Sequence, residues 1–177
     1  MRLHGIPEGL ILLRTAPEDV NVQIKSLSSL TPTPSKLDIT AEIDASEVKE
    51  GQTSIRVRNS DFKLPSGITI TTVSPSAIRI SAERKLRKSV PVKVVFQGAI
   101  PHGLASWRII SEPAMVEIEG PASQVSQIDH VVTDYVDAGQ LTDGKEYHRN
   151  LKPPQKQVSL LRDEPVTIVL KAPNKQR

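Results

Sequence analysis

One pattern of residues occurs twice in this chain, and it constrains the fold more than any other feature. Ile6 to Ile24 read IPEGLILLRTAPEDVNVQI, and Ile100 to Pro121 read IPHGLASWRIISEPAMVEIEGP. Both stretches begin with Ile-Pro-x-Gly-Leu, continue with an apolar run and then reach x-Pro-x-x-Val-x-Val/Ile. Self-similarity of this kind indicates that one structural unit has been duplicated. The sequence therefore predicts two copies of one small fold.

The later part of each copy repeats as well. ITAEIDASEVKEGQ over 39–52 is matched by VVTDYVDAGQLTDGK over 131–145. This match places Asp44 on Asp137 and Gly51 on Gly144. An aspartate at the end of a strand commonly accepts a hydrogen bond from a backbone N–H two residues later, so we expect a turn at both positions.

The repeats divide the chain into two expected domains. We place the first over 1–83 and the second over 90–177, with a basic linker over 84–89 between them. The second copy opens with VPVKVVFQG, whereas MRLHG stands before the first motif. The first strand of the first domain is therefore expected to be truncated, and the chain to be a piece of a longer protein.

Composition and periodicity favour strands. Aromatic residues make up 3% of the chain, so Val, Ile and Leu must form the cores, and β-branched side chains favour strands. The 14 prolines oppose long helices. Apolar and polar residues alternate over 116–119 and 78–80, which is typical of strands with one buried face. We predict a mainly β fold (β-rich α+β), with Val116, Ile118, Val20 and Val22 buried and Arg56, Arg58 and Arg79 facing solvent.

Each copy has room for at most one short helix. In the second copy, Ser123 is a candidate N-cap before Val125, Ile128 and Val132, which recur near helical spacing. The corresponding stretch from Ser26 to Asp38 is broken by prolines and favours a loop or a distorted turn.

Most catalytic and cofactor chemistry finds no support in the sequence. Cysteine is absent, which excludes disulfides, thiolate nucleophiles and cysteine-based zinc sites. The chain lacks an HExxH motif, a glycine-rich phosphate loop and a Ser-His-Asp order. Its net charge of +3 is nearly balanced, and no apolar run is long enough to span a bilayer. We expect a non-enzyme with no catalytic residue, no cofactor and no metal.

The second copy resembles the YbbR domain. The resemblance rests on GAIPHGLASWRIISEPAMVEIEGPASQVSQIDHVVTDYVD, with its Gly-x-x-Pro-x-Gly, Gly-Pro-x-Ser and Val-Asp elements. The first copy is similar to the same domain over EIDASEVKEGQTSIRV and LPSGITITTVSPSAIRISAE, but Lys25 to Ser28 replace the Gly-Pro-x-Ser element. These motifs consist of glycines, prolines and valines, which specify a fold and carry no chemistry.

The resemblance implies a biological setting. YbbR domains are cradle-shaped β modules that occur in tandem behind one N-terminal transmembrane helix. This implies a soluble fragment of a membrane-anchored bacterial protein, on the extracytoplasmic face of the inner (plasma) membrane. It also implies a protein partner and no small-molecule substrate. The partner would be a membrane diadenylate cyclase, whose cyclic di-AMP synthesis the protein would modulate by protein–protein contact.

Seven residues are candidates for an interaction surface. The basic ones could bind phosphates, or could be a solvated linker. The fold is also similar to a domain of ribosomal proteins of the L25 type, so an RNA-binding module using the basic 84–93 segment is the alternative function. The histidine of the IPHGL loop is replaced by Glu8 in the first copy, and the single Trp is either an interface anchor or a packing residue. The candidates are Arg84, Lys85, Arg87, Lys88, Lys93, His102 and Trp107.

Overall fold

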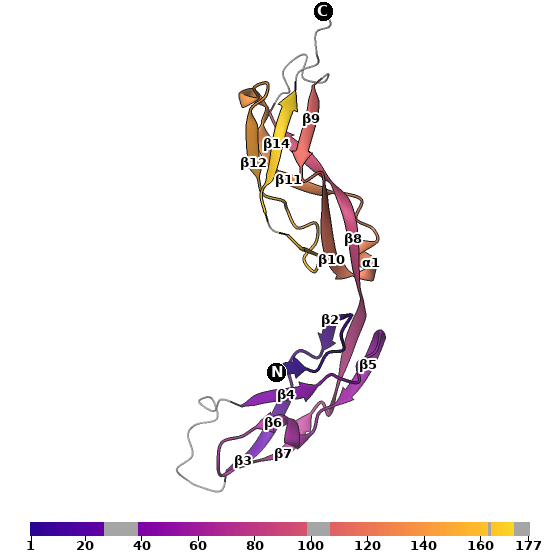
Figure 1. Ribbon diagram of the computed structural model, residues 1–177. Helices are drawn as coiled ribbons and strands as arrows, with labels where there is room; N and C mark the ends of the chain where they lie inside the picture. Colours follow the sequence, from indigo (N-terminus) through magenta and orange to yellow (C-terminus); the bar gives the residue numbers. More distant parts are fainter. Residues whose placement is uncertain (27–38, 99–106, 163, 172–177) are drawn as a thin grey trace, which may run out of the picture. The chain divides into compact units, whose positions relative to one another are not determined.

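The computed structural model describes residues 1–26, 39–98, 107–162 and 164–171 (Figure 1). Strands make up most of this part of the chain, and one short α-helix lies in the second half, so the predicted mainly β class is confirmed. The chain divides into two compact units, Met1–Arg84 (unit 1) and Lys85–Arg177 (unit 2). No helix within these described ranges has the length and apolarity needed to cross a membrane.

Unit 1 contains three groups of paired strands. Strand β4 pairs with β1 in parallel and with β6 in antiparallel, β3 pairs with β7, and the first part of β8 lies between β2 and β5. A 3-10 turn, η2 (Asn59–Asp61), precedes β6. The strands are β1 (Arg2–His4), β2 (Leu10–Ala16), β3 (Asn21–Ser26), β4 (Thr40–Asp44), β5 (Gly51–Arg56), β6 (Phe62–Lys63), β7 (Ile68–Ser74) and β8 (Ala77–Gln97).

Unit 2 repeats this plan. The second part of β8 lies between β11, in parallel, and β10, in antiparallel, while β10 also pairs with β13 and β14 lies between β9 and β12. The elements are β9 (Arg108–Glu112), β10 (Met115–Pro121), α1 (Ala122–Val125), β11 (Val131–Asp137), the 3-10 turn η4 (Ala138–Gln140), β12 (Glu146–Arg149), β13 (Ser159–Leu160) and β14 (Val166–Lys171).

The two units correspond strand by strand. The parallel pair β1–β4 corresponds to β8–β11, and the antiparallel pair β3–β7 corresponds to β10–β13. The β2–β8–β5 group corresponds to β9–β14–β12. The Ala16–Pro17 and Glu112–Pro113 peptide bonds, at matching repeat positions, are both cis. The predicted duplication is therefore present in the fold as well as in the sequence.

Each unit has its own hydrophobic core. In both, alternate residues of a central strand supply the most deeply buried side chains, as the period-2 pattern predicts. Unit 1 buries Ala41, Ile43, Ala45, Val48, Val57, Phe62, Ile78, Ile80 and Ala82. Unit 2 buries Val90, Val116, Ile118, Val125, Ile128, Val131, Val136, Tyr147, Leu151, Val158, Val166, Ile168 and Leu170.

Residues 84–89 differ from the expected basic linker. They are the middle of β8, and Lys85 to Pro91 pair in register with β10. A run of charges is compatible with a strand here because its backbone groups are satisfied by β10 and its long side chains find partners across the pair. Charge composition alone does not reveal those partners.

The burial predictions hold in unit 2 and only in part in unit 1. Val116 and Ile118 are buried, and Arg56, Arg58 and Arg79 are exposed, as predicted. Val20 and Val22 are only partly buried, although they pack on the unit 1 core. In the described part of the chain β3 pairs with β7 alone, whereas β10 is covered by strands on both sides.

The predicted helix of unit 2 is present, but its start is not at Ser123. Helix α1 begins at Ala122, with Pro121 at the N-cap position and no capping side chain. Strand β10 runs directly into the helix, and Pro121 suits the junction because it lacks the N–H that a helix start leaves unpaired. Val125 and Ile128 are buried as expected. The stretch expected to be a distorted turn in the first copy lies almost entirely outside the described residues.

Candidate functional site

Two aspartates at equivalent positions hold equivalent turns. Asp44 Oδ1 accepts a hydrogen bond from the Ser46 N–H at 2.8 Å, and Asp137 Oδ1 accepts one from the Gly139 N–H at 2.9 Å. The predicted turn role of both aspartates is confirmed. The hydrogen bonds from Ser46 hold the pKa of the Asp44 carboxyl below its usual value.

The loops after these turns are held by two different side chains. Thr53 Oγ1 accepts a hydrogen bond from the Lys49 N–H at 3.1 Å in unit 1. In unit 2 the Tyr147 hydroxyl accepts one from the Thr142 N–H at 2.9 Å and donates one to the Gln140 carbonyl at 2.7 Å.

Strand register makes these two side chains equivalent. Thr53 lies opposite Ile80 on the central strand of its group, and Tyr147 lies opposite Ile168 on the corresponding strand. Both central residues are fully buried. Threonine and tyrosine therefore support the same loop from the same position, but only the tyrosine places an aromatic ring beneath it.

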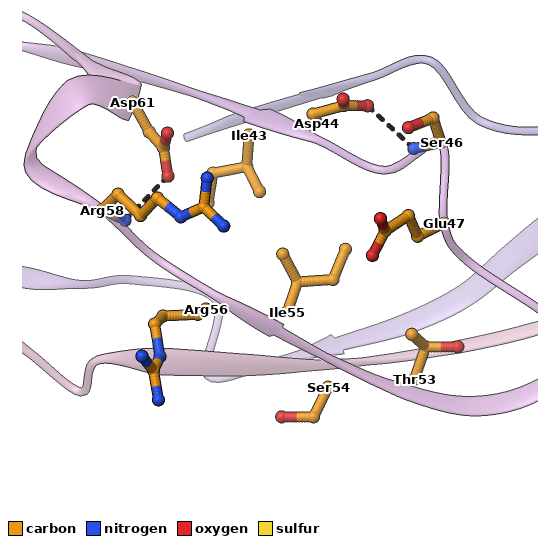
Figure 2. A pocket seen from close by; sticks show the side chains of 10 residues that line it. All are labelled: Ile43, Asp44, Ser46, Glu47, Thr53, Ser54, Ile55, Arg56, Arg58 and Asp61. Carbon is orange, nitrogen blue, oxygen red and sulfur yellow. Dashed lines mark hydrogen bonds between the residues drawn. The ribbon is translucent and has the colours of Figure 1, made fainter.

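A depression of about 380 Å³ lies at this position in unit 1 (Figure 2). Ile43, which is almost fully buried, and Ile55 are its apolar lining residues, and Thr53 and Ser54 line it from β5. In unit 1, Ile55 lies opposite Ile78. At the equivalent position of unit 2, Arg149 lies opposite Val166. Unit 2 thus places a tyrosine and an arginine where unit 1 has a threonine and an isoleucine.

Charged groups stand on two sides of the depression. Figure 2 shows the Arg58 guanidinium and the Glu47 carboxylate directed toward one another, with Ile43 and Ile55 between them, while Arg56 turns away. Neither Arg56 nor Arg58 forms an ion pair with any described residue. The Asp61 carboxylate also lines the depression, but it accepts a hydrogen bond from the backbone N–H of Arg58 at 2.8 Å. The depression therefore offers a cation and an anion across an apolar floor.

The basic segment is largely engaged in contacts within the protein. Lys85 Nζ lies 2.9 Å and Arg87 Nε 2.5 Å from the Glu119 carboxylate, and Arg84 pairs with Glu50 at 2.9 Å. Lys88 Nζ donates to the Ile128 carbonyl at 2.8 Å, just after α1. These contacts neutralise charge that a phosphate-binding surface would present, which weighs against the RNA-binding alternative.

The Glu119 pair gives a pH prediction. Hydrogen bonds from Lys85 and Arg87 lower the pKa of the Glu119 carboxyl, whose side chain is 15% exposed. A lowered folded-state pKa means that this stabilisation is present above the unfolded-state pKa and is lost as the pH falls through the folded-state value. Glu119→Gln should cost about 1 kcal/mol at pH 7 and nothing once the carboxyl is protonated. Urea denaturation at intervals from pH 7 down to pH 2 checks this; a cost that does not decline over that range would contradict it.

The two remaining candidates that the structure describes belong to different elements. Trp107 directly precedes β9, is partly buried and packs against the unit 2 core, which matches the packing alternative for this residue. Lys93 is exposed on β8. His102 lies outside the described residues. Within the described ranges, no group of three or more His, Asp or Glu side chains is arranged to hold a metal ion.

Sequence comparison of the repeats missed the depression for a definable reason. Aligning Gly51 with Gly144 places Thr53 opposite Glu146, one residue away from the structural match with Tyr147. A one-residue difference between the loops causes this shift. Only the strand register reveals that an aromatic side chain has been replaced by a small one.

Comparison with known proteins gives a family match over both units. The model of the family described as YbbR-like protein matches residues 3–82 and again 90–172. A crystal structure of a YbbR-like protein from Streptococcus pneumoniae is 16% identical, with a TM-score of 0.45 and coverage of 97% of this chain and 91% of that one. A solution structure of SuR18C from Streptococcus thermophilus is 24% identical, with a TM-score of 0.39 and coverage of 52% and 91%. No curated protein matches the chain.

Proposed function

The chain belongs to the YbbR-like protein family, and from this premise we propose that it is a non-catalytic interaction module of a membrane-anchored bacterial protein. Its finer role in this proposal is to modulate a membrane diadenylate cyclase, and so cyclic di-AMP synthesis, by protein–protein contact. The observation that supports the proposal is the family match over both units, taken together with the role expected from the resemblance to tandem YbbR domains. The module would act on the extracytoplasmic face of the membrane.

The side-chain chemistry supports binding better than catalysis. Glu42, Asp44 and Glu119 all have a pKa lowered by hydrogen-bond donors, from Lys63, Ser46 and the Lys85–Arg87 pair respectively. A carboxyl group that serves as a general acid near neutral pH needs a raised pKa. The depression in unit 1, with its apolar floor and opposed charges, has instead the polar and apolar mixture of a contact surface.

A co-expression experiment tests the cyclase role. The membrane-tethered protein and a membrane diadenylate cyclase are produced together in a bacterium, and cyclic di-AMP is measured against cells in which the same tether carries an unrelated β domain. We expect a several-fold difference in cyclic di-AMP. Equal levels at matched cyclase abundance would contradict the cyclase role. The proposed location further predicts an apolar helix of about 20 residues ahead of this region in the parent gene product.

A further inference from the structure

We infer that the depression of unit 1 is a socket for a tyrosine side chain on a partner protein, with an acidic residue beside that tyrosine. The socket is defined by Ile43, Glu47, Thr53, Ile55 and Arg58. This inference deepens the proposed function, on which it rests, because it names where the partner docks and by which chemistry.

Unit 2 supplies the internal precedent for the occupant. At the position of Thr53 it carries Tyr147, whose side chain is 7% exposed and belongs to the unit 2 core. The hydroxyl of that tyrosine bonds the loop formed by Gln140 and Thr142. The duplicated fold therefore accommodates a phenol ring at this place, and unit 1 has the place without the ring.

The polar groups of the socket fit a partner segment in which an acidic residue lies next to the tyrosine. Glu47 occupies the repeat position of Gln140, whose carbonyl accepts the Tyr147 hydroxyl, and its own carboxylate faces the socket (Figure 2). A tyrosine hydroxyl entering the socket can donate to Glu47. Arg58 faces it from the other side without an ion pair among the described residues, and can bind the neighbouring carboxylate.

The size of the socket also favours a single side chain. Its volume of about 380 Å³ is at the lower end of the range for ligand pockets, and its lining combines two aliphatic side chains with polar and charged ones. Buried aromatic anchors in small pockets, with charged groups at their rim, are the usual energetic centre of a protein interface.

The test uses 4-hydroxyphenylacetate, which joins a phenol to a carboxylate, and the full chain labelled for NMR. We expect chemical-shift changes at socket residues and saturation on the order of 1–10 mM for a probe of this size. Thr53→Tyr supplies the ring from the chain itself, as unit 2 does, and should weaken binding by about tenfold or more. The matched control is Glu117→Tyr, which adds a tyrosine at an exposed position of β10 and should leave binding unchanged.

A second variant separates the charge from the ring. Arg58→Gln should weaken the binding of 4-hydroxyphenylacetate about three- to tenfold. The binding of p-cresol, a phenol without a carboxylate, should be unchanged. Arg58 is exposed, so this variant tests the socket even where Thr53→Tyr perturbs folding. The inference is overturned when the wild-type chain shows no shifts at socket residues, or when Thr53→Tyr with native spectra binds the probe as well as wild type.

The titration contains no cyclase, so its outcome is independent of the co-expression experiment. If the probe binds at the socket but cyclic di-AMP levels do not change, only the cyclase role is rejected. If cyclic di-AMP levels change but the probe does not bind, only the socket is rejected.

Discussion

Replacing Ile118 with alanine is expected to lower the free energy of unfolding by about 2–5 kcal/mol, the range for truncating a fully buried Ile. Ile118 has 0% exposure and lies on β10, which is covered by β8 on one edge and β13 on the other. The strands on both edges limit collapse around the missing atoms, so a cavity would remain in the unit 2 core.

The adjacent Glu117 provides the matched control. Glu117 is exposed on the opposite face of β10, so Glu117→Ala should change stability by less than about 0.5 kcal/mol. The protein has a single tryptophan, Trp107, which packs against the unit 2 core, so its fluorescence during urea denaturation follows this unit. Similar losses from the two substitutions would contradict the assignment of the buried face.

Gly120→Ala is expected to cost about 1–3 kcal/mol, the usual range for forcing extra atoms into a packed site. A Cβ at Gly120 would lie 2.9 Å from Val158 Cγ2, 3.0 Å from the Gln157 carbonyl oxygen and 3.1 Å from Val158 Cα. Two of these atoms belong to the backbone and cannot move aside as a side chain can. This close approach explains why the Gly-Pro-x-Ser element has a glycine at position 120.

Gly139→Ala, in the same unit, is the control for Gly120. A Cβ there would lie 3.4 Å from Asp137 Oδ1, an ordinary contact, so its effect should be within about 0.5 kcal/mol. Chemical denaturation of both variants, followed through Trp107, compares them directly. A Gly120→Ala variant as stable as the Gly139→Ala one would mean that the 157–158 segment does not pack closely on β10.

The sequence predicted the features that depend on local periodicity. The alternation at Val116-Glu117-Ile118 and the aspartates at the strand ends each have a direct structural counterpart, since burial and turn hydrogen bonds depend on neighbours in sequence. The duplication was visible because its prolines and glycines fix backbone geometry.

Features that depend on partners distant in sequence were missed. The segment 84–89 belongs to a strand because its backbone pairs with β10, about thirty residues later, where Glu119 also forms ion pairs with Lys85 and Arg87. The helix begins at Ala122 because β10 continues up to it, which no capping pattern at Ser123 indicates. The socket was hidden by the one-residue difference between the repeats.

Amide hydrogen exchange of the Ile118→Ala variant tests most directly whether the two copies have separate interiors. We predict that the amides of β10, β11 and β14 lose protection relative to wild type, while those of β4, β5 and β7 keep theirs. A parallel loss of protection in both sets would mean that the two repeats share one cooperative core, and would contradict the separate interiors of the two copies.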